Sequence, residues 1–431
     1  MTRTVALDQL HYADFLRPHD VVGWPQGPGE PLALTRRLIE QRDGLVRPTL
    51  LFGMTTSDTL RPELASHFGL RALNGAGNNR RVTHLAEIVP CHISSIPGLF
   101  DERLLKIDVA LVQVRPMPDG RYTFGVISDF PEAMVRAARV VIALLNPSLP
   151  ATSGDACIDA EHIDLLVDSD DAMIDMPDPV PTATERAVAQ RVASLIPDRA
   201  TVQLGIGTMP TAVAHALDQH RELGVHSGVV SDSLVELVER GVVTNAYKTL
   251  DAGRCVTGGL FGTRRLRDFA HASGLVSMRN ARYTHDLTVT SKLANYYTIN
   301  AAVEVDLSGQ VNAEVAGSRY LGAVGGQVDF VRAGVASRGG RSIMAFPSVT
   351  PDGAHSRITA SLRGHPVTTA RSDVDMVVTE FGMAELRGGS LNERARRLIA
   401  IAHPDHQERL EREFAEGNGQ RTVKRETQVT G

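Results

Sequence analysis

Glycine-rich segments of this sequence offer places where a ligand could lie directly against backbone atoms. Gly205-Ile206-Gly207 follows an apolar run that starts at Thr201 and precedes Pro210, which predicts a strand, a tight turn and the first turn of a helix. The free amides of such a helix N-terminus can stabilise an anion or a developing oxyanion. A tight turn that needs glycine for positive φ explains the same residues without any ligand.

Two further glycine clusters, Gly322–Phe330 and Ser337–Ser342, lie in the C-terminal half. A glycine has no Cβ, so a thioester or another ligand could approach the main-chain amides of Gly325 and Gly326 closely. Arg338 and Arg341 carry charges suited to phosphate groups. The alternative interpretation is that the glycines form plain turns and that the arginines are solvated on the surface. Both interpretations, a ligand site and ordinary turns, remain open.

The elements that would position these turns are strands alternating with helices. Apolar runs such as 107–114 alternate with helical patterns along the chain, which favours open α/β sheets with helices on both faces. The acidic, proline-containing stretch 168–181 predicts a linker, after which Thr182-Ala-Thr-Glu185 has the pattern of a helix capping box. We therefore expect two domains, residues 1–180 and 181–431.

Composition excludes several classes of function. The 431 residues are 42% hydrophobic with a net charge of −5 and no basic stripe, so nucleic acid is not an expected partner. Cys91, Cys157 and Cys255 are widely separated and lack metal-ligand spacing, which favours a reducing compartment and predicts no metal site. No apolar stretch approaches the length of a membrane span, so we expect a soluble cytoplasmic protein.

Ordered sequence blocks give the most specific signal. Seven blocks of the C-terminal half and three of the N-terminal half occur in the order seen in the acetyl-CoA hydrolase/transferase family, which the chain resembles. The most similar-looking members are the 4-hydroxybutyrate and the acetate, propionate or succinate CoA-transferases. The blocks are 108–116, 125–129, 146–150, 201–207, 223–227, 241–245, 299–314, 325–330, 378–388 and 401–404.

This resemblance implies two similar open α/β domains of the class I CoA-transferase type, with the active site in the interdomain cleft. It also implies acyl-CoA as substrate, a small acid or other acceptor, and a homodimer. In the family a glutamate attacks the acyl-CoA thioester, and a glutamyl-CoA thioester follows from an acyl-glutamyl anhydride. By the resemblance, Gly325 and Gly326 support the oxyanion, and CoA contacts come from glycine-rich turns. The residues expected at those turns are Gly205, Ile206, Gly207, Gly322, Gln327, Arg338 and Arg341.

Gly228 stands where the family usually carries the attacking carboxylate, directly after His226-Ser227. Glycine has no nucleophile, so the glutamyl reaction cannot proceed through this position. In an extended segment the side chains of 226 and 228 point to one face, which makes His226 the expected neighbour of the vacated space. It would activate water there, or it is a structural histidine of the family. Glu304 and Glu380 lie in blocks that coexist with the glutamate, so neither is an evident replacement.

Four functions follow as hypotheses. The first is CoA or acyl transfer from an acyl-CoA without a glutamyl-CoA intermediate, and the main alternative is thioester hydrolysis. A conventional transferase in which another carboxylate substitutes is the third, and a non-catalytic acyl-CoA binder is the fourth. If the rest of the site is intact, Gly228→Glu is expected to create or increase CoA exchange.

Overall fold

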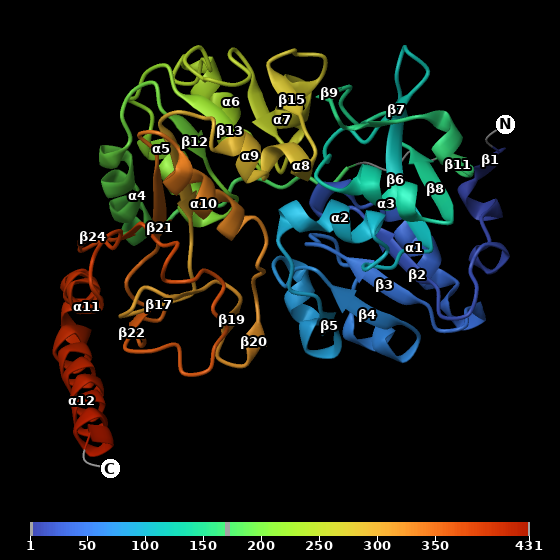
Figure 1. The fold of residues 1–431 in the computed structure, drawn as a ribbon. Helices are drawn as coiled ribbons and strands as arrows, with labels where there is room; N and C mark the ends of the chain where they lie inside the picture. Colours follow the sequence, from blue (N-terminus) through green and yellow to red (C-terminus); the bar gives the residue numbers. More distant parts are fainter. Residues whose placement is uncertain (1–2, 169–172, 430–431) are drawn as a thin grey trace.

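Two separate sheets of mainly parallel strands form the framework of the protein (Figure 1). The computed structural model describes residues 3–168 and 173–429. Within these residues the first sheet has ten strands, ordered β1-β11-β8-β6-β2-β3-β4-β5, with β7 beside β6 and β10 beside β7. Their bounds are β1 Arg3–Ala6, β2 Val21–Trp24, β3 Thr49–Phe52, β4 Gly69–Ala72, β5 Glu87–Ile88, β6 Val109–Pro116, β7 Tyr122–Thr123, β8 Val140–Leu145, β10 Cys157–Ile158 and β11 Leu165–Asp168.

The second sheet has nine strands among the described residues, ordered β24-β23-β21-β16-β12-β13-β14-β15-β9, and only β24 is antiparallel to its neighbour. Its strands are β9 Ser153–Gly154, β12 Thr201–Gln203, β13 Gly224–Ser227, β14 Cys255–Thr257, β15 Val276–Met278, β16 Tyr296–Asn300, β21 Arg341–Ala345, β23 Met376–Thr379 and β24 Gly382–Glu385. Two small sheets accompany it, formed by β17 Glu304–Asp306, β18 Val311–Asn312 and β22 Ile358–Thr359, and by β19 Val315–Ala316 and β20 Arg319–Tyr320.

Helices and loops cover both faces of each sheet, because successive strand side chains point to opposite sides. In β16, Tyr297 joins the apolar cluster beneath α4–α7, whereas Tyr296 packs with Phe330 of α10 on the other face. In β2, Val21 and Val22 likewise belong to two different clusters. The predicted fold class, open α/β sheets buried on both faces, is therefore confirmed.

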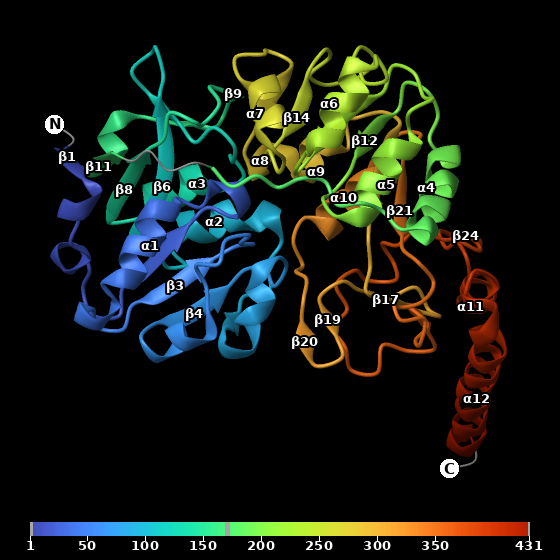
Figure 2. The same ribbon diagram turned by 180° about the vertical axis from the view of Figure 1, so that it is seen from behind.

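The helices are short apart from the last one, which Figure 2 shows projecting from the second half of the molecule. The first half holds α1 Leu32–Glu40, α2 Ile96–Asp101 and α3 Pro131–Ala137. The second half holds α4 Ala183–Leu195, α5 Thr208–Ala216, α6 Asp232–Glu239, α7 Arg264–Ala270, α8 Ala281–Thr284, α9 Leu287–Thr290, α10 Gln327–Ala336, α11 Leu391–Ala400 and α12 Pro404–Val429.

The segment between the sheets ties them together. The predicted capping box is confirmed, because Thr182 Oγ1 accepts from Glu185 N–H and the Glu185 carboxylate accepts from Thr182 N–H. Part of the predicted linker, 169–172, lies outside the described residues. Further along the linker, Asp178 accepts a 2.8 Å hydrogen bond from Ser233 N–H in the first turn of α6. The sheets fall on either side of residue 180 except for β9, which comes from the first half and pairs with β15.

Candidate active site

The carboxyl ends of parallel strands from both sheets open onto one cleft of about 600 Å³. In the first sheet, residues that follow β2, β3 and β4 line it, and in the second sheet, residues that follow β12 and β13 do so. Ligands of open α/β sheets bind at this end of the strands. Among the described residues that line the cleft, the side chains that titrate are Asp129, Asp178 and His285.

Gly205, Ile206 and Gly207 all line the cleft and connect β12 to α5. Gly207 is the N-cap of α5 at φ 108°, a left-handed conformation that favours glycine, and no atom lies within 4 Å of the position its Cβ would take. Backbone conformation thus accounts for this glycine. The first turn of α5 leaves N–H groups without intrahelical partners at the cleft.

A second helix begins at the same cleft. Gly325 and Gly326 line it, and Gly326 is the N-cap of α10. The Gly325 carbonyl accepts a 3.0 Å hydrogen bond from Ile93 N–H, which joins this turn to the first half. Gln327 also lines the cleft, but its amide donates to Ala301 O at 2.6 Å and accepts from Thr369 Oγ1 at 2.9 Å, so the side chain is held by the protein itself.

Gly228 lies on the cleft wall, one residue beyond the end of β13. A Cβ built on it would lie 2.7 Å from His285 Nε2, closer than real Cβ atoms approach another heavy atom. A Cβ built on Gly326 would lie 2.6 Å from the same nitrogen. Two glycines from different elements thus make room for one imidazole.

The imidazole of His285 is fixed by its surroundings. His285 directly follows α8 and is 5% exposed. Its Nδ1 is 2.8 Å from Thr284 Oγ1, and its ring centroid is 4.6 Å from that of Phe330. Burial lowers the pKa of His285 to about 3, so the ring is neutral at physiological pH.

The expectation that His226 is the nearest neighbour of the vacated space is wrong. His226 is fully buried in β13, does not line the cleft, and its Nε2 is 3.2 Å from the Thr284 carbonyl. The reason is that β13 ends at Ser227, so the period-two alternation that would place 226 and 228 on one face does not extend to Gly228. His285 occupies that space instead.

Burial of His226 predicts sensitivity to acid. Burial lowers the pKa of His226 to about 3, whereas an unfolded histidine titrates near 6.5. As pH falls from 6.5 towards 3, the His226 imidazole binds a proton in the unfolded state but not in the folded state. The free energy of unfolding therefore decreases in this pH range. His226→Gln should make the fall in unfolding free energy between pH 7 and 4.5 smaller by about 2.5 kcal/mol, at about 1.4 kcal/mol per pH unit below 6.5. Urea unfolding at each pH measures it. Equal pH dependence in the variant, with exposed His215→Gln as control, would contradict this.

Asp129 is the buried carboxylate of the cleft. Its Oδ2 accepts from Gln26 Nε2 at 2.6 Å and its Oδ1 from the Phe130 N–H at 2.7 Å, and neither partner is charged. Burial raises the pKa of Asp129 to about 7, and these two hydrogen bonds oppose the rise. Asp129 is the last residue of the block 125–129, but nothing in the sequence predicted a role for its side chain. His285 had no comparable signal.

Three residues expected to contact CoA are not brought to this cleft. Arg341 begins β21, and since β21 runs parallel to β16 and β12, its amino end lies at the opposite edge of the sheet. There Arg341 pairs with Asp375 and Glu385, each at 3.2 Å. Arg338 precedes it and is exposed. Gly322 does not line the cleft either. A Cβ at this position would lie 1.9 Å from the Ala313 carbonyl oxygen, so close backbone packing accounts for the glycine.

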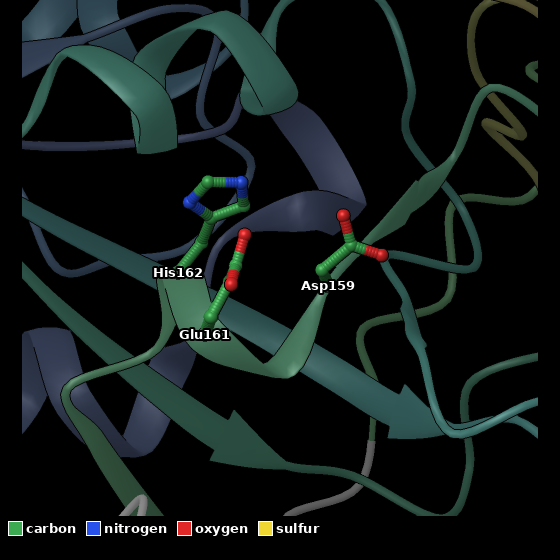
Figure 3. A group of neighbouring side chains, drawn as sticks. All are labelled: Asp159, Glu161 and His162. Atoms are coloured by element: carbon green, nitrogen blue, oxygen red, sulfur yellow. The ribbon is translucent and has the colours of Figure 1, made fainter.

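One group of possible metal ligands occurs among the described residues, and its members do not line the cleft. Asp159, Glu161 and His162, around a turn between β10 and β11, bring one ligand atom each within 4.8 Å of one another (Figure 3). Both acids are exposed, and nothing beyond proximity distinguishes the group from ordinary surface acids. The expectation that no metal is required stays a prediction.

Fold and cleft together define an α/β protein with a cleft where two mainly parallel sheets meet. Residues 12–176 match the acetyl-CoA hydrolase/transferase N-terminal domain and residues 262–414 match the acetyl-CoA hydrolase/transferase C-terminal domain. The chain is 39% identical to the 4-hydroxybutyrate coenzyme A transferase of Clostridium kluyveri, over 92% of this chain and 94% of that one. It belongs to the acetyl-CoA hydrolase/transferase family and is an enzyme of that family.

Solved structures agree with this assignment. RipA from Yersinia pestis has 30% identity and a TM-score of 0.90, covering 96% of this chain and 98% of the other. The 4-hydroxybutyrate CoA-transferase from Porphyromonas gingivalis has 32% identity and a TM-score of 0.82, covering 96% and 97%. Within the described residues, no helix combines the length and apolarity that crossing a membrane requires.

Proposed function

We propose that this protein cleaves an acyl-CoA thioester in the interdomain cleft and passes the acyl group or CoA to a small acid or other acceptor, without a glutamyl-CoA intermediate. The observation that carries the proposal is Gly228, which lines the cleft at the end of β13 with no side chain to attack the thioester. The other parts of the site support thioester chemistry. Helices α5 and α10 both begin at the cleft, where the free backbone amides of their first turns can stabilise an oxyanion.

Thioester hydrolysis is the second candidate. It is favoured by the placement of a neutral imidazole, His285, beside Gly228, the position at which the sequence resemblance places the family's nucleophile. A non-catalytic acyl-CoA binder is the candidate of another class, and it predicts that the thioester stays intact after long incubation. Homodimeric assembly and a cytoplasmic location stay predictions from the sequence.

An activity survey tests the proposed function. Acetyl-, propionyl-, butyryl- and succinyl-CoA are each incubated with the protein, alone and with a panel of carboxylic acids, and CoA and acyl-CoA products are separated by chromatography. Release of CoA or formation of a new acyl-CoA supports the proposal. Binding of these acyl-CoAs by calorimetry with no consumption of any of them would favour the binder instead.

Asp129 predicts how pH changes the affinity for an acid. Because burial raises the pKa of Asp129 to about 7, its carboxyl is mainly neutral at pH 6 and mainly charged at pH 8. A carboxylic acid product or acceptor in the same cleft is an anion, so its affinity should weaken as pH rises through 7, by an amount on the order of tenfold for about 1.4 kcal/mol of repulsion. The inhibition constant of the acid, measured from pH 6 to 8, checks this.

Asp129→Asn provides the matched comparison. Asparagine can keep both hydrogen bonds if the Gln26 amide turns over, and it does not titrate. The inhibition constant should then be nearly independent of pH in this range. The same pH dependence in both proteins would remove Asp129 as its cause.

A further inference from the structure

We infer that His285 is a catalytic residue, the general base that activates an O–H acceptor, water first, for direct attack on the thioester. This inference rests on the proposed function and narrows its acceptor to molecules that must lose a proton. A carboxylate acceptor is already ionised and needs no base, whereas water or an alcohol does.

Two glycines leave the space that the His285 imidazole occupies. Gly228 follows β13 and Gly326 caps α10, and a Cβ on either would lie within 2.7 Å of His285 Nε2. The imidazole therefore fills the space into which a side chain at 228 would project. Phe330, itself a cleft residue, packs against the ring. The group that replaces the missing carboxylate side chain in space is thus a base.

The tautomer follows from the hydrogen bonds on the other side of the ring. Thr284 Oγ1 donates its single proton to the Asn280 carbonyl at 3.1 Å and lies 2.8 Å from His285 Nδ1. When that proton goes to the Asn280 carbonyl, Nδ1 carries a proton and donates it to Thr284 Oγ1, and this is the tautomer that we assign. Nε2 is left with its lone pair free, the form that accepts a proton.

Nε2 is also available. His285 lines the cleft, and among the described residues no hydrogen-bond partner of Nε2 occurs. His226, the other buried histidine nearby, differs in this respect, because its Nε2 meets the Thr284 carbonyl and it does not line the cleft. His285 is therefore the histidine that can reach a cleft-bound molecule.

The step balances without any further reactant. Nε2 takes a proton from water as the water oxygen bonds to the thioester carbon, giving a tetrahedral oxyanion beside the first turn of α10. Collapse breaks the C–S bond, and the CoA thiolate takes the proton back from Nε2. The products are a carboxylic acid and CoA, and the imidazole is restored.

Three variants test the inference: His285→Ala, His285→Gln and, as control, His220→Ala. CoA release from the best acyl-CoA, with no added acid, should fall about 10²-fold in His285→Ala, the lower end of the usual contribution of a general base, because a ring with a pKa of about 3 is a weak base. His285→Gln should be as slow, because an amide fills the space without accepting the proton. Added imidazole should restore part of the rate in His285→Ala. His220 bonds the Ala193 and Ile196 carbonyls away from the cleft, so His220→Ala should keep its turnover.

Melting temperature and acyl-CoA affinity are measured on the same proteins, so that a folding defect is separated from a chemical one. Unchanged turnover in His285→Ala, or wild-type turnover in His285→Gln, would overturn the inference and leave the proposed function standing. Absence of turnover in the wild-type protein with every acyl-CoA would overturn both. Slow turnover in both variants with rescue by imidazole supports the inference.

Discussion

Gly228→Glu is expected to form no glutamyl-CoA adduct while His285 is present, and to form one when His285→Ala accompanies it. The Cβ of residue 228 would lie 2.7 Å from His285 Nε2. Contacts with Phe330 and Thr284 hold the His285 imidazole in place. Glutamate and His285 therefore compete for one space. Because His285 occupies the space beside Gly228, we now expect Gly228→Glu alone not to create exchange activity, in contrast to the expectation for an intact site.

The experiment measures acyl-CoA exchange with a labelled carboxylic acid and traps the enzyme with borohydride for mass spectrometry. His285→Ala alone is the control, since it has the space but no nucleophile. The double variant should show an adduct on residue 228 and gain exchange, whereas the two single variants should not. A full gain of exchange in Gly228→Glu alone would show that His285 yields easily and that the two residues are not coupled.

Gly322→Ala is expected to destabilise the protein by about 2 kcal/mol or more, a typical cost of inserting a methyl group where there is no room. The new Cβ would lie 1.9 Å from the Ala313 carbonyl oxygen. Both atoms are attached directly to the main chain, so neither can move unless the backbone moves with it. The Gly322 carbonyl also accepts a 2.7 Å hydrogen bond from Gly75 N–H, so a shift would disturb the contact between the two halves.

Gly98→Ala is the matched control, because this glycine lies in α2 and no atom lies within 4 Å of its Cβ position. Its stability should be unchanged or slightly raised, as alanine favours helix. Denaturant unfolding measures both. If Gly322→Ala kept wild-type stability but lost affinity for acyl-CoA, the original expectation of a CoA-binding role for Gly322 would be restored.

The fold was predictable because its signals are local. The alternation of apolar runs with helical patterns and the Thr182–Glu185 capping box each depend on residues close in sequence, and both match the structure. The turn at Gly205–Gly207 was predictable for the same reason. These features place the carboxyl ends of the strands, and hence the cleft.

The chemistry of the site was only half predictable, since it depends on residues far apart in sequence. Gly228 could be singled out as a site residue because an ordered sequence block predicts a carboxylate at that position, and the structure places Gly228 on the cleft wall. His285 was missed because only the fold brings it against Gly228 and Gly326. Asp129 was missed because its raised pKa is caused by burial, and a single aspartate in the sequence does not indicate whether its side chain is buried.

The central claim is that thioester cleavage here proceeds without a carboxylate of the protein carrying the acyl group or CoA. The direct test is to incubate the wild-type protein with the acyl-CoA it consumes fastest, add borohydride during turnover, and compare the intact mass and the peptide masses with those of untreated protein. The account predicts release of CoA with unchanged protein mass. A mass change on a glutamate, or on Asp129, would show that another carboxylate has replaced the missing one and would contradict it.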